Sequence, residues 1–153
     1  MWNPFKRSAD TLLTASDKQL LVEAIQLAEK NTSGEIRVYV ESKLGKGDAL
    51  SRATEIFFKH KMNETKERNG VLVYVAVNDK KIAIYADQGI YEKMGIEFWY
   101  SQVQDMTGHF KSMNYVLGIS TVIREIGQAL HSHFPFDSAT DTNELSDEIM
   151  IGK

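Results

Sequence analysis

The stretch R-N-G-V-L-V-Y-V-A-V-N-D-K-K-I-A-I-Y-A-D-Q-G, residues 68–89, decides the fold of this chain. Its first half, Val71 to Val77, is an almost unbroken apolar run rich in β-branched residues, which predicts a strand covered on both faces. Residues 78–80 can turn the chain, because Asn and Asp tolerate left-handed backbone, and Ile82 to Ala86 is typical of a second strand. The resulting hairpin brings the two polar, glycine-containing ends of the stretch side by side. These two loops are the first candidate for a functional site.

The segments around the hairpin predict helices and one further strand. A helix begins at Ser16, where Gln19 completes a capping box, and residues 35–42 alternate between apolar and polar as in a half-buried strand. A helix beginning after Asp48 precedes the hairpin, and three helices follow it, over residues 90–94, 97–110 and 114–134. The order α-β-α-β-β-α-α-α predicts an α/β domain with helices on both faces of a small mixed sheet.

Length and composition are those of one globular domain. The chain has 153 residues, a net charge of −3 and no Cys, which argues against a nucleic-acid binder and excludes disulfides and a thiolate zinc site. The first residues lack the apolar run of a signal peptide, and no window is long and apolar enough to span a bilayer. We therefore expect a soluble, cytoplasmic protein with no transmembrane segment.

Residues 137–153 differ in composition from the preceding domain, residues 1–136. This C-terminal tail is acidic, rich in hydroxyl groups and poor in large apolar side chains. One interpretation is a disordered tail. The other is that Leu145, Ile149 and Ile151 dock on the domain or on a protein partner.

Two ends of the predicted sheet compete as the location of a site. In open α/β sheets, ligands usually bind at the carboxyl ends of the parallel strands, which here is the turn at Asn78 and Asp79. The candidate loops at residues 68–70 and 87–89 lie at the opposite end. The sequence leaves both ends open.

Three ordered blocks resemble the TPM-domain family: S-G-E-I-R-V-Y-V (33–40), R-N-G-V-L-V-Y-V-A (68–76) and K-I-A-I-Y-A-D-Q-G-I (81–90). The family includes thylakoid-lumen acid phosphatase and photosystem II repair proteins of plants, and the ending N-E-L-S-D-E-I resembles a short, soluble bacterial subgroup. The resemblance implies a three-layer α/β/α, Rossmann-like domain, divalent-cation binding with calcium as the candidate, and acid phosphatase activity. Two departures from the family pattern fall on the candidate loops: Arg68, where relatives often have Asp, and Asp87-Gln88-Gly89, where they often have Gly-x-Gly.

Hard oxygen ligands near the candidate loops define the predicted cation site, because calcium prefers carboxylate, amide and carbonyl oxygens. The candidate ligands are Asp87, Asn69, Glu67, Glu92, Glu97 and Glu35. The alternative for Asp87 is a cap for the helix that follows it, and the alternative for Glu35 is plain solvent exposure.

Phosphoester hydrolysis would need a metal-activated water, because no nucleophile motif is present, and Arg68 could then pair with the phosphate. No catalytic residue is assigned. The leading prediction is a TPM-like domain that binds a divalent cation in a regulatory or assembly role. The alternatives are a metal-dependent acid phosphatase acting on small phosphoesters and a protein-interaction module that uses the acidic tail.

Overall fold

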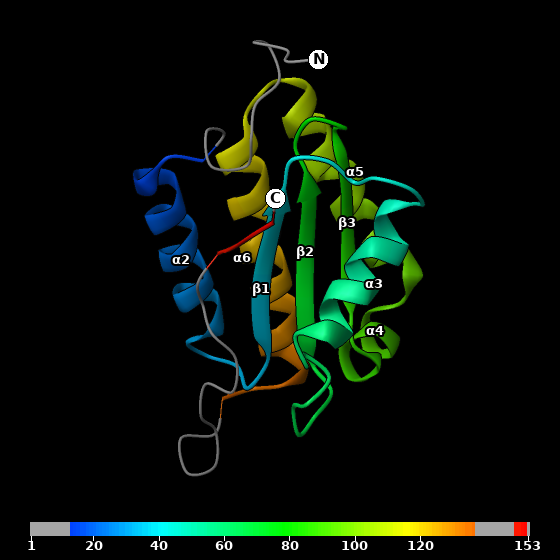
Figure 1. The fold of residues 1–153 in the computed structure, drawn as a ribbon. Coiled ribbons are helices and arrows are strands. Elements are labelled where there is room, and N and C mark those ends of the chain that lie inside the picture. Colours follow the sequence, from blue (N-terminus) through cyan, green and yellow to red (C-terminus); the bar gives the residue numbers. More distant parts are fainter. Residues whose placement is uncertain (1–12, 137–148, 153) are drawn as a thin grey trace.

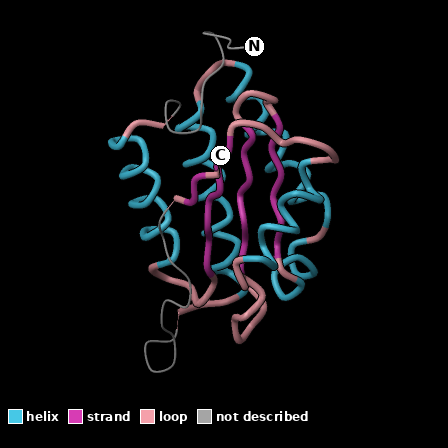
Figure 2. The backbone as a smooth tube through the Cα atoms, in the orientation of Figure 1, coloured by secondary structure: helices cyan, strands magenta, loops and turns pink. Residues whose placement is uncertain are grey.

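A four-stranded sheet forms the centre of the molecule, in the order β3-β2-β1-β4. The computed structural model describes residues 13–136 and 149–152 (Figures 1 and 2). Strand β1 is parallel to β2 and to β4, whereas β2 and β3 are antiparallel. The strands are β1 (Glu35–Glu41), β2 (Gly70–Ala76), β3 (Lys81–Ala86) and β4 (Met150–Ile151).

Helices cover both faces of this sheet. Helix α3 packs on one face, and α2, α5 and α6 pack on the other (Figure 1). The helices are α2 (Ala15–Glu29), α3 (Ala49–Lys59), α4 (Gln88–Met94), α5 (Ile96–Lys111) and α6 (Tyr115–His133). The predicted three-layer α/β/α fold with a small mixed sheet is therefore confirmed.

The predicted hairpin of β2 and β3 is present, with β2 inside the sheet and β3 at its edge. Every residue of β2 is buried, because its alternate side chains enter two different cores. Val71 and Val73 face the larger core under α6, while Leu72 and Tyr74 face the smaller core under α3. An apolar run without alternation thus encodes a strand buried on both faces.

The end of the C-terminal tail is part of the sheet. Gly152 N–H donates to the Val40 carbonyl at 2.7 Å, and Ile149 and Ile151 pack against the larger core. Strand β4 thereby pairs with Tyr39 and Val40 at the outer edge of β1. Docking on the domain is the interpretation that holds for these residues, whereas Leu145 lies outside the described residues.

Two local predictions are corrected by the structure. The cap of α2 is Thr14, which forms a capping box with Asp17, so Ser16 lies inside the helix and the predicted pairing with Gln19 is wrong. Strand β1 is not half-buried, since its polar face lies in contact with the α3 layer. The predicted cap at Asp48 is confirmed, because its side chain accepts from Ser51 N–H at 2.8 Å.

Candidate functional site

The two loops at the end of the hairpin meet through an ion pair. Arg68 Nε donates to Asp87 Oδ2 at 2.6 Å, and Arg68 Nη2 donates to Asp87 Oδ1 at 2.8 Å. The Asp87 side chain is only 1% exposed, and its hydrogen bonds raise the pKa of the Arg68 guanidinium. This two-bond geometry is the strong form of a carboxylate–guanidinium pair, so Arg68 supplies the charge that the buried carboxylate needs.

Asp87 also begins helix α4. Its Oδ1 accepts from Gln88 N–H at 2.8 Å, so the predicted role as a helix cap is confirmed. Gly89 N–H donates to the Arg68 carbonyl at 2.8 Å and fastens the loops together. A Cβ at Gly89 would lie 2.2 Å from the Glu67 carbonyl oxygen, so only glycine permits this approach.

A second polar group lies beside the pair, at the amino ends of β1 and β2. Asn69 Nδ2 donates to Ser33 Oγ at 3.1 Å, and Ser33 Oγ donates to Glu67 Oε2 at 3.2 Å. Glu35 N–H donates to the Asn69 carbonyl at 3.4 Å. Four predicted site residues, Asp87, Asn69, Glu67 and Glu35, therefore share one end of the sheet. Ser33 joins them and was missed, although its position directly before a parallel strand places it at this same edge.

The other predicted ligands lie elsewhere. Glu92 on α4 and Glu97 on α5 are exposed, and in the described part of the chain neither side chain makes a hydrogen bond or an ion pair. Glu35, in contrast, is 2% exposed, so the alternative of plain solvent exposure is wrong. Within residues 13–136 and 149–152, no group of three or more His, Cys, Asp or Glu side chains is arranged to hold a metal.

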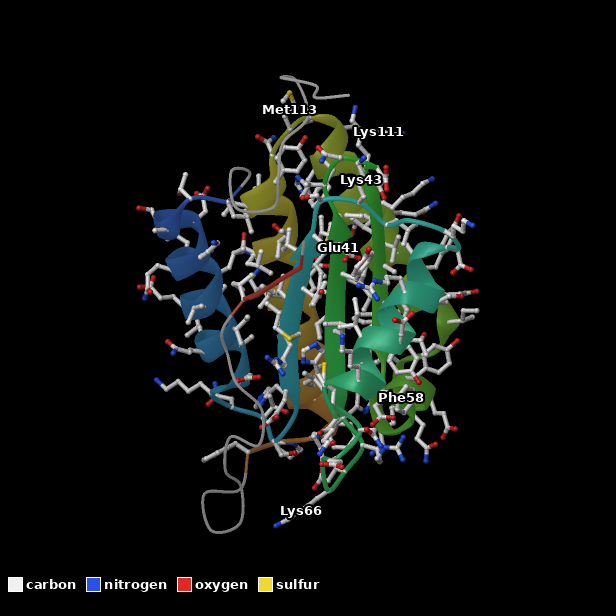
Figure 3. All side chains as sticks on the ribbon, in the orientation of Figure 1. Glu41, Lys43, Phe58, Lys66, Lys111 and Met113 are labelled. Carbon is white, nitrogen blue, oxygen red and sulfur yellow. The ribbon has the colours of Figure 1, made fainter. Side chains whose placement is uncertain are left out.

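The carboxyl ends of the parallel strands hold a different polar cluster. Arg52 of α3 donates to Glu41 through Nε at 2.9 Å and Nη2 at 3.0 Å, and Tyr74 donates its hydroxyl hydrogen to the same carboxylate. Burial, with the hydrogen bond to Glu41, raises the pKa of Tyr74. Glu41 lies inside the domain, whereas Lys66 extends from the loop before β2 (Figure 3). Because its charges are paired within the domain, this cluster joins α3 to the sheet.

An apolar hollow lies away from both polar clusters. A groove of about 550 Å³ runs along the outer edge of β3, and α3, α4 and α5 contribute its walls. Four large side chains on these walls are exposed to between 40% and 70%. They are Leu50, Tyr91, Ile96 and Tyr100. We name this feature the β3 groove.

The fold is that of a small mixed α/β domain. The loops that flank its hairpin are joined by the Arg68–Asp87 ion pair at one end of the sheet. The chain belongs to the TPM-domain family, whose model matches residues 7–129. None of the curated proteins matches the sequence.

Solved structures with this fold extend the comparison. The BA42 protein of the psychrophilic bacterium Bizionia argentinensis is 41% identical, with 92% of this chain and 95% of that chain covered and a TM-score of 0.83. The N-terminal domain of a P. gingivalis protein is 16% identical, with 80% and 79% of the two chains covered and a TM-score of 0.66. The N-terminal domain of cg2496 from Corynebacterium glutamicum is 10% identical, with 95% and 93% covered and a TM-score of 0.66. The last two show likeness of fold alone.

None of the helices in the described ranges has both the length and the apolar character needed to cross a membrane.

Proposed function

We propose that this TPM domain has an assembly role, in which the β3 groove binds a protein partner. The observation that carries the proposal is an apolar groove of about 550 Å³ whose exposed side chains gather on three elements around one strand. A contiguous exposed apolar surface of this kind marks an interaction site in proteins, whereas single exposed apolar residues need no explanation. Large aromatic residues such as Tyr100 are also the usual anchors of a protein interface.

The polar clusters differ from the β3 groove in that their charged groups are already paired within the domain. Both oxygens of Asp87 are bonded to Arg68, and the Glu41 carboxylate is bonded to Arg52 and Tyr74. Such internally paired charges stabilise the loops that carry them. The groove, in contrast, exposes apolar surface that a partner would remove from water, at about 25 cal/mol for each Å².

Site-directed cross-linking tests the assembly role. A photo-cross-linking residue in place of Tyr100 should capture one partner in cells, whereas the same residue in place of the exposed Leu117 on α6, outside the groove, should not. The captured partner is then purified and titrated against Ile96→Asp and, as a matched control, Leu117→Asp. We expect Ile96→Asp to weaken binding at least about tenfold and Leu117→Asp to leave it unchanged. Equal effects of the two substitutions would overturn the proposal.

Divalent-cation binding is the second candidate function, and the polar chain at the amino ends of β1 and β2 favours it. Glu67 and Ser33 place carboxylate and hydroxyl oxygens next to each other there, and Asn69 adds an amide whose nitrogen donates to Ser33. These are the oxygen types that calcium prefers. The exposed Glu67 would give up only its bond from Ser33 to face a cation, whereas Asp87 would first have to leave Arg68.

Titration of the full chain with calcium, followed by NMR of the backbone amides, tests this second candidate. The amides of Ser33 and Asn69 should shift at about millimolar calcium, and Glu67→Gln should abolish the shift. Glu64→Gln, in the same loop and also exposed, is the matched control that should keep it. Shifts that persist in Glu67→Gln would show that Glu67 is not a ligand and would contradict a cation site at this position.

The remaining predictions from the sequence stay predictions. Metal-dependent phosphatase activity rests on the family resemblance, and two of the N–H groups through which Arg68 could meet a phosphate are bonded to Asp87. Hydrolysis of an aryl phosphate across acidic and neutral pH, with Asp87→Ala as control, tests it. A cytoplasmic location is likewise a prediction.

A further inference from the structure

Alternate residues of β3 direct their backbone N–H and C=O groups toward the outer edge of the sheet. Asp87 N–H donates to the Gly70 carbonyl at 2.9 Å, which makes Gly70 and Asp87 a hydrogen-bonded pair of the antiparallel ladder. Such pairs alternate along antiparallel strands. The register therefore directs the N–H and C=O groups of Ala83 and Tyr85 toward β2, and those of Ile82, Ile84 and Ala86 away from it.

The sheet treats its two edges differently. The edge of β1 is paired with β4 at Tyr39 and Val40, while β3 is the last strand on the other side among residues 13–136 and 149–152. An edge strand with open backbone groups is a template for a further strand, and proteins normally blunt or cover such an edge. Here the open groups of Ile82, Ile84 and Ala86 lie in the floor of an apolar groove instead.

The walls of the groove fit the two faces of an added strand. Ile84 and Ala86 point into the larger core, toward the side of the sheet on which α5 contributes Ile96, Tyr100 and Val103 to the groove. Ala83 belongs to the smaller core, on the side where α3 contributes Leu50. Since successive side chains of a strand point to opposite faces, alternate residues of an added strand would meet these two walls. The α5 wall is the more extensive and favours the larger apolar side chains.

Charges at the two ends of the groove favour particular flanking charges on an antiparallel segment. Lys80 and Lys81 are exposed where β3 begins, and the exposed Glu92 lines the groove near the end where β3 stops. A strand antiparallel to β3 places its carboxyl end beside the two lysines and its amino end near Glu92. For this antiparallel strand, an acidic flank at the carboxyl end and a basic flank at the amino end complement these charges, whereas the same segment laid parallel would bring like charges together.

We propose that β3 accepts an extended apolar segment of a partner protein as an antiparallel fifth strand, oriented by an acidic flank at the segment's carboxyl end. This inference rests on the proposed function, since it specifies how the partner occupies the β3 groove. Main-chain hydrogen bonds to Ile82, Ile84 and Ala86 supply affinity, and the pockets on the two walls select alternate side chains.

A synthetic peptide tests the strand directly. The probe is acetyl-Lys-Val-Thr-Val-Ile-Val-Asp-Asp-amide, added to the full chain at up to about 1 mM, a concentration that detects weak binding. Bound peptide should slow amide hydrogen exchange at Ile82, Ile84 and Ala86. Ala83 and Tyr85, whose amides face β2, are the internal controls and should not change. The charge-exchanged peptide acetyl-Asp-Asp-Val-Thr-Val-Ile-Val-Lys-amide should bind at least about fivefold more weakly.

Alternate N-methylation of the peptide separates strand pairing from apolar contact without altering the protein. Methyl groups on the peptide amides that face β3 should abolish binding. Methyl groups on the amides that point away from β3 should leave most of the binding intact. On the protein, Ile82→Pro removes one outward donor and should weaken binding, whereas Ile82→Ala loses the side chain but keeps that donor and should bind more tightly than Ile82→Pro.

Each result decides the proposal separately from the proposed function. Absence of peptide binding, equal effects of both methylation phases, or unchanged exchange at Ile84 overturns strand addition. A partner still cross-linked through Tyr100 would in those cases preserve the assembly role. Slow exchange at Ile84 before any peptide is added also overturns the proposal. If this slow exchange is lost when residues 1–12 are removed, the edge pairs with this chain's own N-terminal segment. If it depends on protein concentration, the edge pairs with a second copy of the chain.

Discussion

Arg68 acts as a built-in cation for the carboxylate of Asp87. A buried carboxylate needs a positive partner and hydrogen bonds, and this one receives two bonds from a guanidinium and one from the backbone of Gln88. At the position where the family pattern often has Asp, this chain thus carries the opposite charge. A cation at Asp87 itself would have to compete with a charge that the chain already provides.

Substitution of Asp87 should separate its two roles. Asp87→Ala removes both the cap of α4 and the ion pair, and we expect it to lower the free energy of unfolding by about 2 kcal/mol. Asp87→Asn keeps a carbonyl oxygen for Gln88 N–H and should cost about 1 kcal/mol. Urea unfolding of the two variants measures both values. Equal losses would show that the cap contributes nothing to stability.

The tyrosine at the opposite end of the sheet predicts an alkaline limit of stability. Because burial raises the pKa of Tyr74 in the fold above the ordinary value of 10.0, the hydroxyl stays protonated in the folded chain while the unfolded chain ionises. Its contribution is therefore complete below about pH 10 and is lost as the pH rises further. Tyr74→Phe should cost about 1 kcal/mol at pH 8, and its deficit should shrink above pH 10. Urea midpoints measured from pH 7 to 11 check this; a constant deficit would contradict it.

At the scale of elements, the joint between the hairpin and α4 depends on one glycine. Gly89 lies so close to the Glu67 and Arg68 carbonyls that an added Cβ would come within 2.5 Å of both oxygens. The neighbours are backbone atoms, so the loops would have to separate.

We expect Gly89→Ala to lower the free energy of unfolding by about 2 kcal/mol or more, the scale of an overpacked core site. Gly108→Ala in α5 is the matched control, because a Cβ there meets nothing within 4 Å. That control should stabilise the protein by up to about 1 kcal/mol, since alanine is the better helix former. Thermal or urea unfolding of both variants measures these changes. An unchanged free energy of unfolding in Gly89→Ala would contradict the expectation and would mean that the two loops can separate without loss of stability.

The elements show where sequence patterns are informative. The hairpin and the order of the helices were predictable, because β-branched runs and helical stripes extend over whole elements. Strand β4 was not, since a strand of two residues has no period to detect. The cap of α2 was misplaced by two residues, from Thr14 to Ser16, because both are good capping residues at the edge of the same apolar stripe.

The site was predictable only in part, for a similar reason. The hairpin alone places residues 68 and 87 together, so their proximity followed from the pattern, while the pairing of their charges did not. The β3 groove was missed because it arises where α3, α4 and α5 converge. Its signal was present: Ile96 and Tyr100, four residues apart, form a second apolar stripe on α5 outside the core stripe of Trp99 and Met106.

At the scale of the whole molecule, the end of the C-terminal tail occupies part of the edge of β1. Removal of residues 149–153 would uncover the edge of β1 that β4 now occupies. We expect this variant to associate with itself at high concentration, because an exposed edge strand pairs with other chains. Sedimentation velocity over a range of concentrations measures it. Removal of Lys153 alone, which leaves β4 intact, is the control, and a truncated chain that stays monomeric would contradict the expectation.

Strand β4 also directs where a partner segment can add. It is the edge strand on its own side of the sheet, but with two residues it is a poor template for pairing. The six residues of β3 are the longer template, so strand addition is directed to one side of the domain.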